Sequence, residues 1–322
     1  KNQLHEKSGK VRVAFIGGGA FARSTILPKM KENGSFVFHA LATTGGVSTG
    51  QTAGMDDFSY ITNDYKKVIQ DPDIDLVVIS TNHNSHAKFI IEALEEGKSV
   101  YCEKPLCLSL EELDKIESAY RTSNGNLFCG MNRRFASLMF QIKAELKTNE
   151  VPAVYDYIVN AGEIPADHWT QDESIGGGRI IGEACHMVDA IQSLDESPIE
   201  DLRLTFADAP GYPCRDNVLI TMSMKSGAIA NIVYTSMGSK KYPKEQLRVF
   251  SAGNVFEMNN YVGLSRYSNT KKSSPKIKQD KGIKREYEYM LEVLCGERKN
   301  AVIEDAFVGH RMLLEALEHY RG

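Results

Sequence analysis

Apolar residues follow two different patterns along the chain, and the change falls near its middle. In the first half, nearly continuous apolar runs occupy residues 11–16, 75–80 and 99–102, which is typical of parallel strands buried on both faces. Apolar side chains at helical spacing follow these runs, as in residues 85–96, where Gly97 is a natural helix end. This alternation predicts a doubly wound parallel sheet with right-handed crossovers.

The other segments of the first half fit the same architecture. Ser109 and Glu112 have the spacing of a capping box, so a helix is expected to begin there. The remaining expected elements are strands at 36–43, 58–60 and 126–130, a helix at 21–30, and short helical or loop segments at 47–54 and 64–70.

From about residue 153 the pattern becomes β-rich. Residues 219–224 alternate between apolar and polar, which is typical of antiparallel strands with one covered face. Expected strands are 154–161, 202–207, 217–224, 228–235, 246–251 and 255–257, expected helices are 180–194, 283–295 and 304–320, and 268–281 is expected to be a Lys- and Ser-rich surface loop. We therefore predict an α/β Rossmann domain at 1–131, followed by an α+β domain at 132–322 with an open, mostly antiparallel sheet.

The composition is that of an ordinary globular protein and narrows the function classes. The chain has 322 residues, 42% of them hydrophobic and 25% charged, with a net charge of only -4 and no long basic block. Nothing therefore suggests a nucleic-acid partner. No apolar stretch approaches the roughly 20 residues that a membrane span needs, and no signal peptide is visible, so a cytoplasmic location is expected.

The cysteines and the first residue add two further expectations. The six cysteines are scattered without a C-x-x-C pair, which favours free thiols over zinc or disulfides, and no metal site is predicted. The chain begins at Lys1 without a methionine, so we expect a processed product or a fragment of a longer protein.

A glycine-rich turn follows the first predicted strand. Its pattern, Gly17-x-Gly19-x-x-Ala22, is the dinucleotide-binding fingerprint in its G-x-G-x-x-A form. Gly17 would permit a tight turn, Gly19 would admit a pyrophosphate, and Ala22 would allow close packing of helix on strand. Such turns are common without a nucleotide, but the βαβ context favours binding at the helix N-terminus.

Ligands of doubly wound sheets bind beyond the carboxyl ends of the strands. Four such ends carry unusual residues in this chain. The expected cofactor-binding residues are Gly17, Gly19, Ala20, Phe21, Ala22, Thr43, Thr44, Thr81, Asn82, His83, His86, Glu103 and Lys104.

The end of the second strand bears on the choice of cofactor. It carries Thr43 and Thr44, with neither an acidic residue for a ribose hydroxyl nor an arginine for a 2′-phosphate. Both NAD and NADP stay open on these residues, and NAD is the preferred expectation.

Several motifs in order resemble the glucose–fructose oxidoreductase/inositol dehydrogenase (Gfo/Idh/MocA) family. They are the glycine turn, Thr81 to His86, Glu103-Lys104-Pro105 in Gly97 to Leu106, Asn132-Arg133-Arg134-Phe135, Gly176 to Arg179, and His186 with Asp189. The resemblance spans essentially the whole chain. The second half is also similar to the C-terminal module of two-part bacterial oxidoreductases whose first half is zinc-alcohol-dehydrogenase-like, so such a fused domain is a possible partner.

The resemblance implies an NAD(P)-dependent oxidoreductase. Hydride would pass between nicotinamide and a hydroxyl or keto carbon of a sugar, cyclitol or nucleotide-sugar, in carbohydrate or surface-polysaccharide metabolism. The same resemblance implies a homo-oligomer formed through the open sheet face. Two alternatives stay open: a non-catalytic nucleotide-binding regulatory or scaffold module of this fold, and redox-assisted glycoside cleavage with cofactor recycling.

The resemblance also implies roles for individual residues. Lys104 would donate to a substrate oxygen or the carboxamide and Glu103 would orient it, whereas His186 would be the acid/base with Asp189 fixing its tautomer. By position alone, an exposed turn lysine and a satisfied core histidine would be the simpler interpretations.

The chain departs from the family near His186. Gly182 stands where the family commonly has an aspartate, and Glu183 is the expected replacement at i-3 from His186. Arg133 is expected to bind an anionic substrate group, although a surface arginine at a helix start is the simpler interpretation. Trp169, the only tryptophan, is expected either to stack on a sugar or to fill a small core.

Overall fold

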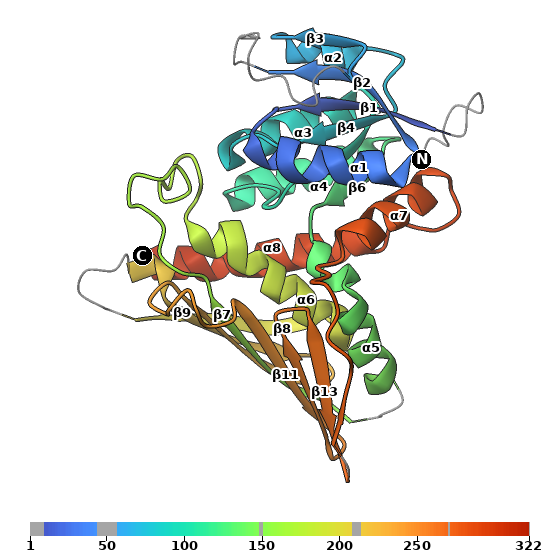
Figure 1. The fold of residues 1–322 in the computed structure, drawn as a ribbon. Coiled ribbons are helices and arrows are strands. Elements are labelled where there is room, and N and C mark those ends of the chain that lie inside the picture. The colour runs from blue at the N-terminus through green and yellow to red at the C-terminus, as the bar shows by residue number, and fades with distance from the viewer. Residues whose placement is uncertain (1–9, 44–56, 148–150, 208–213, 270, 322) are drawn as a thin grey trace. The chain divides into compact units, whose positions relative to one another are not determined.

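The computed structural model describes residues 10–43, 57–147, 151–207, 214–269 and 271–321 (Figure 1). These residues form two compact units. The first unit comprises residues 1–130 and 284–303, and the second comprises residues 131–283 and 304–322. Each unit has its own sheet and its own buried core.

The first unit contains the predicted doubly wound sheet. Its six strands all pair in parallel in the order β3-β2-β1-β4-β5-β6. The order reverses between β1 and β4, which is the point where such sheets bind ligands. The strands are β1 (Val11–Ile16), β2 (Phe36–Ala42), β3 (Tyr60–Thr62), β4 (Leu76–Ile79), β5 (Ser99–Cys102) and β6 (Leu127–Cys129).

Helices connect these strands much as the apolar spacing predicts. Ser109 begins α4, and its hydroxyl accepts a hydrogen bond from the Glu112 backbone N–H at 3.2 Å, while the Glu112 carboxylate reaches back to the N–H of Leu108 at 2.9 Å. The helical segments are η1 (Ala22–Ile26), α1 (Leu27–Asn33), α2 (Tyr65–Gln70), η2 (His83–Ser85), α3 (His86–Glu95) and α4 (Leu110–Thr122). The prediction for 47–54 lies outside the described residues.

Helix α7 (Ile283–Leu294) packs with the first unit, although a single break after residue 131 was expected. Tyr287 on α7 is only 1% exposed, and its ring meets Phe36 and Tyr101 edge-on at 6.2 and 5.7 Å. The Asn300 side chain donates to the Leu127 carbonyl at 2.6 Å. The chain therefore returns to the first unit after passing through the second, because buried aromatic rings of both segments complete one core.

The second unit is built on one eight-stranded sheet, in the order β14-β13-β12-β11-β7-β10-β9-β8. Only the pair β7 and β10 is parallel among the described pairs, so the sheet is mostly antiparallel as predicted. The strands are β7 (Val154–Asn160), β8 (Ile199–Phe206), β9 (Val218–Met224), β10 (Ile229–Thr235), β11 (Glu245–Ser251), β12 (Asn254–Asn259), β13 (Gly263–Tyr267) and β14 (Lys271–Ser273).

Helices lie along one face of this sheet (Figure 1). In β7 the side chains of Tyr155, Tyr157 and Val159 are buried, while those of Asp156 and Ile158 alternate with them and are partly exposed. This period of two shows that one sheet face is covered. The helical segments are η3 (Asn132–Phe135), α5 (Ser137–Leu146), η4 (Ile180–Ala184), α6 (Cys185–Asp195), η5 (Cys214–Asp216) and α8 (Val302–Arg321), the last from residue 304 on.

Strand β14 lies inside the segment 268–281, which was expected to be a surface loop. It pairs with β13 at the edge of the sheet, and neither β13 nor α5 was predicted. Lysines are common on edge strands because they discourage pairing with other chains, so a Lys-rich composition resembles that of a loop.

The described part of the chain shows neither a disulfide among the cysteines named below nor a helix that could span a membrane. Cys102, Cys107, Cys129, Cys185 and Cys295 are free thiols. Among the described helices, none has the length and apolar character that a membrane span requires.

Candidate active site and cofactor-binding turn

The glycine turn connects β1 to η1. It follows the strand at which the order of the sheet reverses, because β1 has β2 on one side and β4 on the other. Gly17 has a φ of 96°, and a Cβ on it would lie 2.8 Å from the Ser80 carbonyl oxygen. The Ser80 hydroxyl donates to the Gly17 carbonyl at 3.0 Å. Glycine is therefore required at position 17 by both backbone conformation and space.

Gly19 is constrained by no such contact. Apart from its neighbours in the chain, a Cβ placed there would meet no described atom within 4 Å. Gly19, Ala20 and Phe21 are exposed, whereas Ala22 is 1% exposed and packs into the core. The first N–H groups of a helix have no partners within it, so this open turn fits a pyrophosphate group.

The loop after β4 is tied to the loop after β5 by His86. This side chain is fully buried, with Nδ1 2.7 Å from the Pro105 carbonyl and Nε2 3.1 Å from the Thr81 carbonyl. Burial lowers the pKa of His86, although the two carbonyl groups favour the charged ring. His86 thus holds the two loops together, and its place among the cofactor-binding residues stays a prediction.

The other cofactor candidates occupy these same strand ends. The Thr81 hydroxyl lies 2.6 Å from that of Ser85, Asn82 is exposed, and His83 is 7% exposed. The Thr43 backbone N–H donates to the Thr62 carbonyl at 3.0 Å. Thr44 lies outside the described residues.

Glu103 and Lys104 follow β5 and are both half-buried. The Glu103 carboxylate accepts a hydrogen bond from the Tyr101 hydroxyl at 3.2 Å. A Cβ on Gly130 would lie 3.1 Å from Glu103 Oε2, so this glycine leaves room for the carboxylate. The E-K-P segment is thereby anchored to the core of the first unit.

In the second unit, a buried carboxylate organises the surroundings of His186. Glu245 is 0% exposed and accepts hydrogen bonds from Arg133 Nη2 at 3.1 Å, Lys281 Nζ at 2.6 Å and the Tyr157 hydroxyl at 2.9 Å. Burial disfavours its charge, but the two cations outweigh that effect and lower the pKa of Glu245 to about 2. This cluster holds Arg133 in a fixed orientation.

Arg133 in turn reaches His186. Its Nη1 lies 3.5 Å from Nε2 of His186, which is 5% exposed and stands in the first turn of α6. An arginine N–H can only donate, so Nε2 is the acceptor in this contact. In this structure the single lone pair of Nε2 therefore faces the guanidinium of Arg133.

Asp189, expected to fix the ring of His186, pairs with Arg134 instead. Arg134 Nε donates to Asp189 Oδ2 at 3.0 Å, and Nη2 of the same guanidinium lies 3.0 Å from Oδ1 and 2.9 Å from Asp305 Oδ2. Burial is the main reason why the pKa of Asp189 rises to about 6. Asp189 lies three residues after His186 on the same helix. Its carboxylate is nevertheless bound by the buried guanidinium of Arg134, which belongs to η3.

Glu183 stands in the π-helical turn η4 before α6. Its carboxylate pairs with Arg179 at 3.1 Å and with Lys244 at 3.7 Å. Arg179 is 3% exposed and also donates to the Gly162 carbonyl at 2.7 Å. Trp169 is half-buried, and its ring centroid lies 5.9 Å from that of His168.

Sequence reasoning missed the residues that complete this cluster. They are Glu245, Tyr157, Lys281 and Asp305. Glu245 is 112 residues from Arg133, so no local spacing indicates the pair. The signal in the sequence was Glu245 itself, an acidic residue at the start of an otherwise alternating strand. A buried carboxylate at such a position needs a cationic partner.

Comparison with known proteins agrees with both units. Residues 11–131 match the family described as "Oxidoreductase family, NAD-binding Rossmann fold". Residues 149–253 match the GFO/IDH/MocA C-terminal domain. The two matches together cover more than half of the chain.

Individual relatives are more distant. An uncharacterized oxidoreductase of Bacillus subtilis is 28% identical over 190 residues, covering 56% of this chain and 54% of the relative. The myo-inositol 2-dehydrogenase of Thermotoga maritima is 24% identical over 205 residues, covering 61% of this chain and 60% of the relative. The matched part thus spans between about half and three-fifths of these two relatives.

A solved structure shows the same fold over nearly the whole chain. Levoglucosan dehydrogenase in complex with NADH superposes with a TM-score of 0.79 at 18% identity, covering 96% of this chain and 97% of that one. The glycine turn, the sheet order and the two family matches support one conclusion. The chain belongs to the GFO/IDH/MocA oxidoreductase family, with an NAD-binding Rossmann domain followed by that family's C-terminal domain.

Proposed function

We propose that this protein is an NAD-dependent oxidoreductase that acts on a hydroxyl-bearing carbon of a sugar or cyclitol. The open Gly19 turn at the β1–β4 reversal carries the proposal, because a Cβ at Gly19 would meet no described atom within 4 Å beyond its chain neighbours, which leaves room for a pyrophosphate at the helix N-terminus. The relatives named myo-inositol 2-dehydrogenase and levoglucosan dehydrogenase support the substrate class.

The first unit would hold the cofactor. The turn from Gly17 to Ala22 would bind the pyrophosphate, and Thr43 with Thr44 would contact the adenosine ribose. When bound, NAD supplies a nicotinamide ring that accepts or returns a hydride. Lys104, anchored through Glu103, would donate a hydrogen bond to the substrate oxygen that gains or loses its proton.

The second unit would handle that proton. Once its Nε2 lone pair is released from the long Arg133 contact, His186 would take the proton of the substrate hydroxyl on oxidation and return it on reduction. Because Glu245 engages its guanidinium, Arg133 is a positioning residue in this proposal, as are Asp189 and Glu183. Trp169 is kept as a candidate surface for stacking on a sugar ring.

The experiment is NAD reduction by the purified protein with a panel of polyols, including myo-inositol, levoglucosan and phosphorylated sugars. Lys104→Ala and His186→Ala should each lower kcat by about 100-fold or more while leaving the NADH Kd nearly unchanged. His168→Ala and Lys115→Ala, which change exposed side chains, are the controls.

Two outcomes would contradict the proposal. Full activity in the His186→Ala variant would show that His186 is not the acid/base group. Tight NADH binding with no turnover of any polyol would instead favour a non-catalytic module, the alternative that Gly182 suggests.

A further inference from the structure

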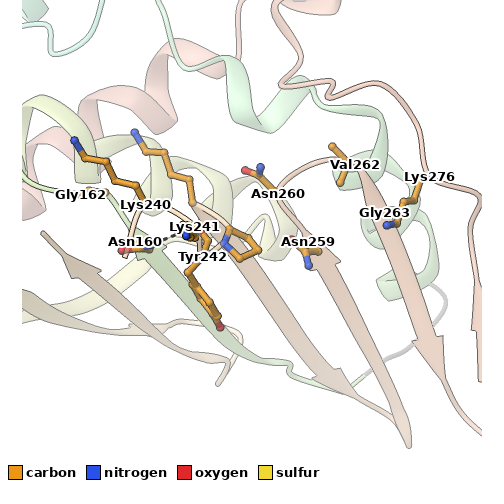
Figure 2. Close-up of a pocket in the computed structure, with 13 residues that line it drawn as sticks. Asn160, Gly162, Lys240, Lys241, Tyr242, Asn259, Asn260, Val262, Gly263 and Lys276 are labelled. Carbon is orange, nitrogen blue, oxygen red and sulfur yellow. Dashed lines mark hydrogen bonds between the residues drawn. The ribbon is translucent and has the colours of Figure 1, made fainter. Parts of the chain in front are cut away.

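A pocket of about 640 Å³ opens at one end of the second unit's sheet. It is formed by the end of β7, the loop from β10 to β11, the turn from β12 to β13, and Lys276 (Figure 2). Its lining residues are Asn160, Ala161, Gly162, the segment 240–244, Asn259, Asn260, Val262, Gly263 and Lys276.

Positive charge dominates this lining. Lys240, Lys241, Lys244 and Lys276 contribute ammonium groups, and no lining residue is acidic. Figure 2 shows Lys240 and Lys241 extending toward the same side, with Lys276 at the other end of the pocket. The whole chain has a net charge of -4, so this is a local concentration that attracts anions.

Three of these four lysines form no ion pair with the described residues. Lys244 lies 3.7 Å from Glu183, whereas Lys240, Lys241 and Lys276 form no ion pair with any described residue. Lys240, Lys241 and Lys276 are also exposed, so a ligand would not have to displace an existing partner.

The lysine-bearing loop is held in place by a buried amide. Asn160 is 8% exposed, and its Nδ2 donates to the carbonyls of Ser239 at 2.7 Å and Tyr242 at 3.4 Å. A Cβ on Gly238 would overlap Asn160 Oδ1, so the close passage of the loop over this amide requires glycine. The loop therefore has a fixed base, and its lysines project from a built platform.

The pocket shares its framework with the His186 cluster inside the same unit. Lys244 immediately precedes Glu245, which pairs with Arg133 beside His186. On the opposite wall, the Asn260 N–H donates to the Glu245 carbonyl at 2.6 Å. The pocket lining is thus joined through Glu245 and Arg133 to His186, the proposed acid/base group.

We propose that the substrate carries a phosphate-type anionic group, which Lys240, Lys241, Lys244 and Lys276 bind in this pocket. The inference rests on the proposed function and narrows it from any polyol to a phosphate-bearing sugar. A sugar monophosphate and a nucleoside-diphosphate sugar share this chemistry. Flexible ammonium groups suit both, since lysine binds phosphate as a point charge without a fixed fork geometry.

Calorimetric titration of the full chain, saturated first with NADH, tests this proposal. The probes are glucose, glucose 1-phosphate and UDP-glucose, and NADH saturation keeps their phosphates away from the glycine turn. We expect both phosphate-bearing probes to bind about tenfold or more tightly than glucose, and UDP-glucose more tightly than glucose 1-phosphate if the natural group is a diphosphate. Binding should weaken near 1 M salt, where the Debye length is about 3 Å.

Variants locate the binding. Lys240→Gln combined with Lys241→Gln should weaken the phosphate-bearing probes about tenfold while leaving NADH binding unchanged. Lys225→Gln, an exposed lysine of the same unit outside the pocket, is the matched control. Equal affinity for glucose and glucose 1-phosphate, or phosphate binding unaffected by the double substitution, would overturn the inference.

The test also separates this inference from the proposed function. NADH binding is measured first, so a protein that ignores NADH fails as an oxidoreductase before any sugar is added. Lysine-dependent binding of glucose 1-phosphate to that same protein would still support the pocket. Normal NADH binding with no preference for phosphate would reject the pocket alone.

Discussion

Glu245 is a fully buried carboxylate between two cations, Arg133 and Lys281. Removing one member of such a buried cluster leaves the other charges without compensation. The pairing also lowers the pKa of Glu245 to about 2, which ties its contribution to pH. Because the folded state holds this proton less readily than the unfolded state, its stabilisation is complete above about pH 4.5 and is lost as the pH falls toward 2.

Glu245→Gln should therefore lower the free energy of unfolding at pH 7 by about 3 kcal/mol. The difference between wild type and variant should shrink as the pH falls from about 4.5, since protonation then removes the same charge in the wild type. Urea denaturation at several pH values measures this difference. Glu200→Gln, an exposed carboxylate on β8, is the control, and a difference independent of pH would show that Glu245 is not ionised in the folded protein.

Individual residues were predictable where the reason for them is local. Gly17 and Ala22 follow from the geometry of a strand-to-helix turn, and the structure gives each the expected surroundings. The partner of Asp189 was not predictable. Its i+3 relation to His186 is visible in the sequence, but Arg134 reaches it from 55 residues away.

At the scale of elements, α7 shows how the chain distributes its helices. The helix follows the β-rich segment in sequence, yet its buried Tyr287 completes an aromatic cluster with Phe36 and Tyr101. Its apolar spacing predicts the helix itself, because that pattern is local. The spacing does not predict which of the two sheets the apolar face of α7 packs against, because that choice depends on tertiary contacts.

Tyr287→Ala should destabilise the first unit by about 3 kcal/mol, because it removes a buried ring from that cluster. Hydrogen exchange resolved by peptide should show faster exchange in β1, β4 and β5, with little change in β7 and β10. Lys284→Ala, an exposed position on the same helix, should leave all of these strands unchanged. Equal acceleration in both units would contradict the assignment of α7 to the first.

Among the missed elements, the edge strand β14 has a cause in its composition. Residues 271–273 are Lys- and Ser-rich, and this edge strand has only one neighbour in the sheet, so little apolar periodicity marks it. In contrast, β4 and β5 are buried throughout and stand out as apolar runs. Strands buried on both faces are therefore visible in the sequence, whereas the polar edge strand β14 is not.

At the scale of the whole molecule, the chain contains two structural units, and each carries its own candidate site residues. The first contains an open glycine turn at a strand-order reversal, and the second contains the buried His186 and a lysine-lined pocket. The sequence motifs predict the turn, Lys104 and His186 as site candidates. They did not reveal the Glu245 cluster or the pocket, because those arise from pairings between distant strands.

Cofactor binding by the glycine turn is the central claim, and Gly19 allows a direct test of it. A Cβ there meets no described atom within 4 Å beyond its chain neighbours, so Gly19→Val should fold normally while filling the space that a pyrophosphate needs. Gly263→Val, at an equally open glycine of the second unit, is the matched control for the titration.

The measurement is the NADH Kd of the wild type, Gly19→Val and Gly263→Val, followed by the fluorescence of the nicotinamide, with the melting temperature recorded for each. We predict saturable binding by the wild type and by Gly263→Val. For Gly19→Val we predict a Kd about tenfold or more higher at an unchanged melting temperature. Absence of saturable NADH binding in the wild type, or equal binding by Gly19→Val, would contradict the account.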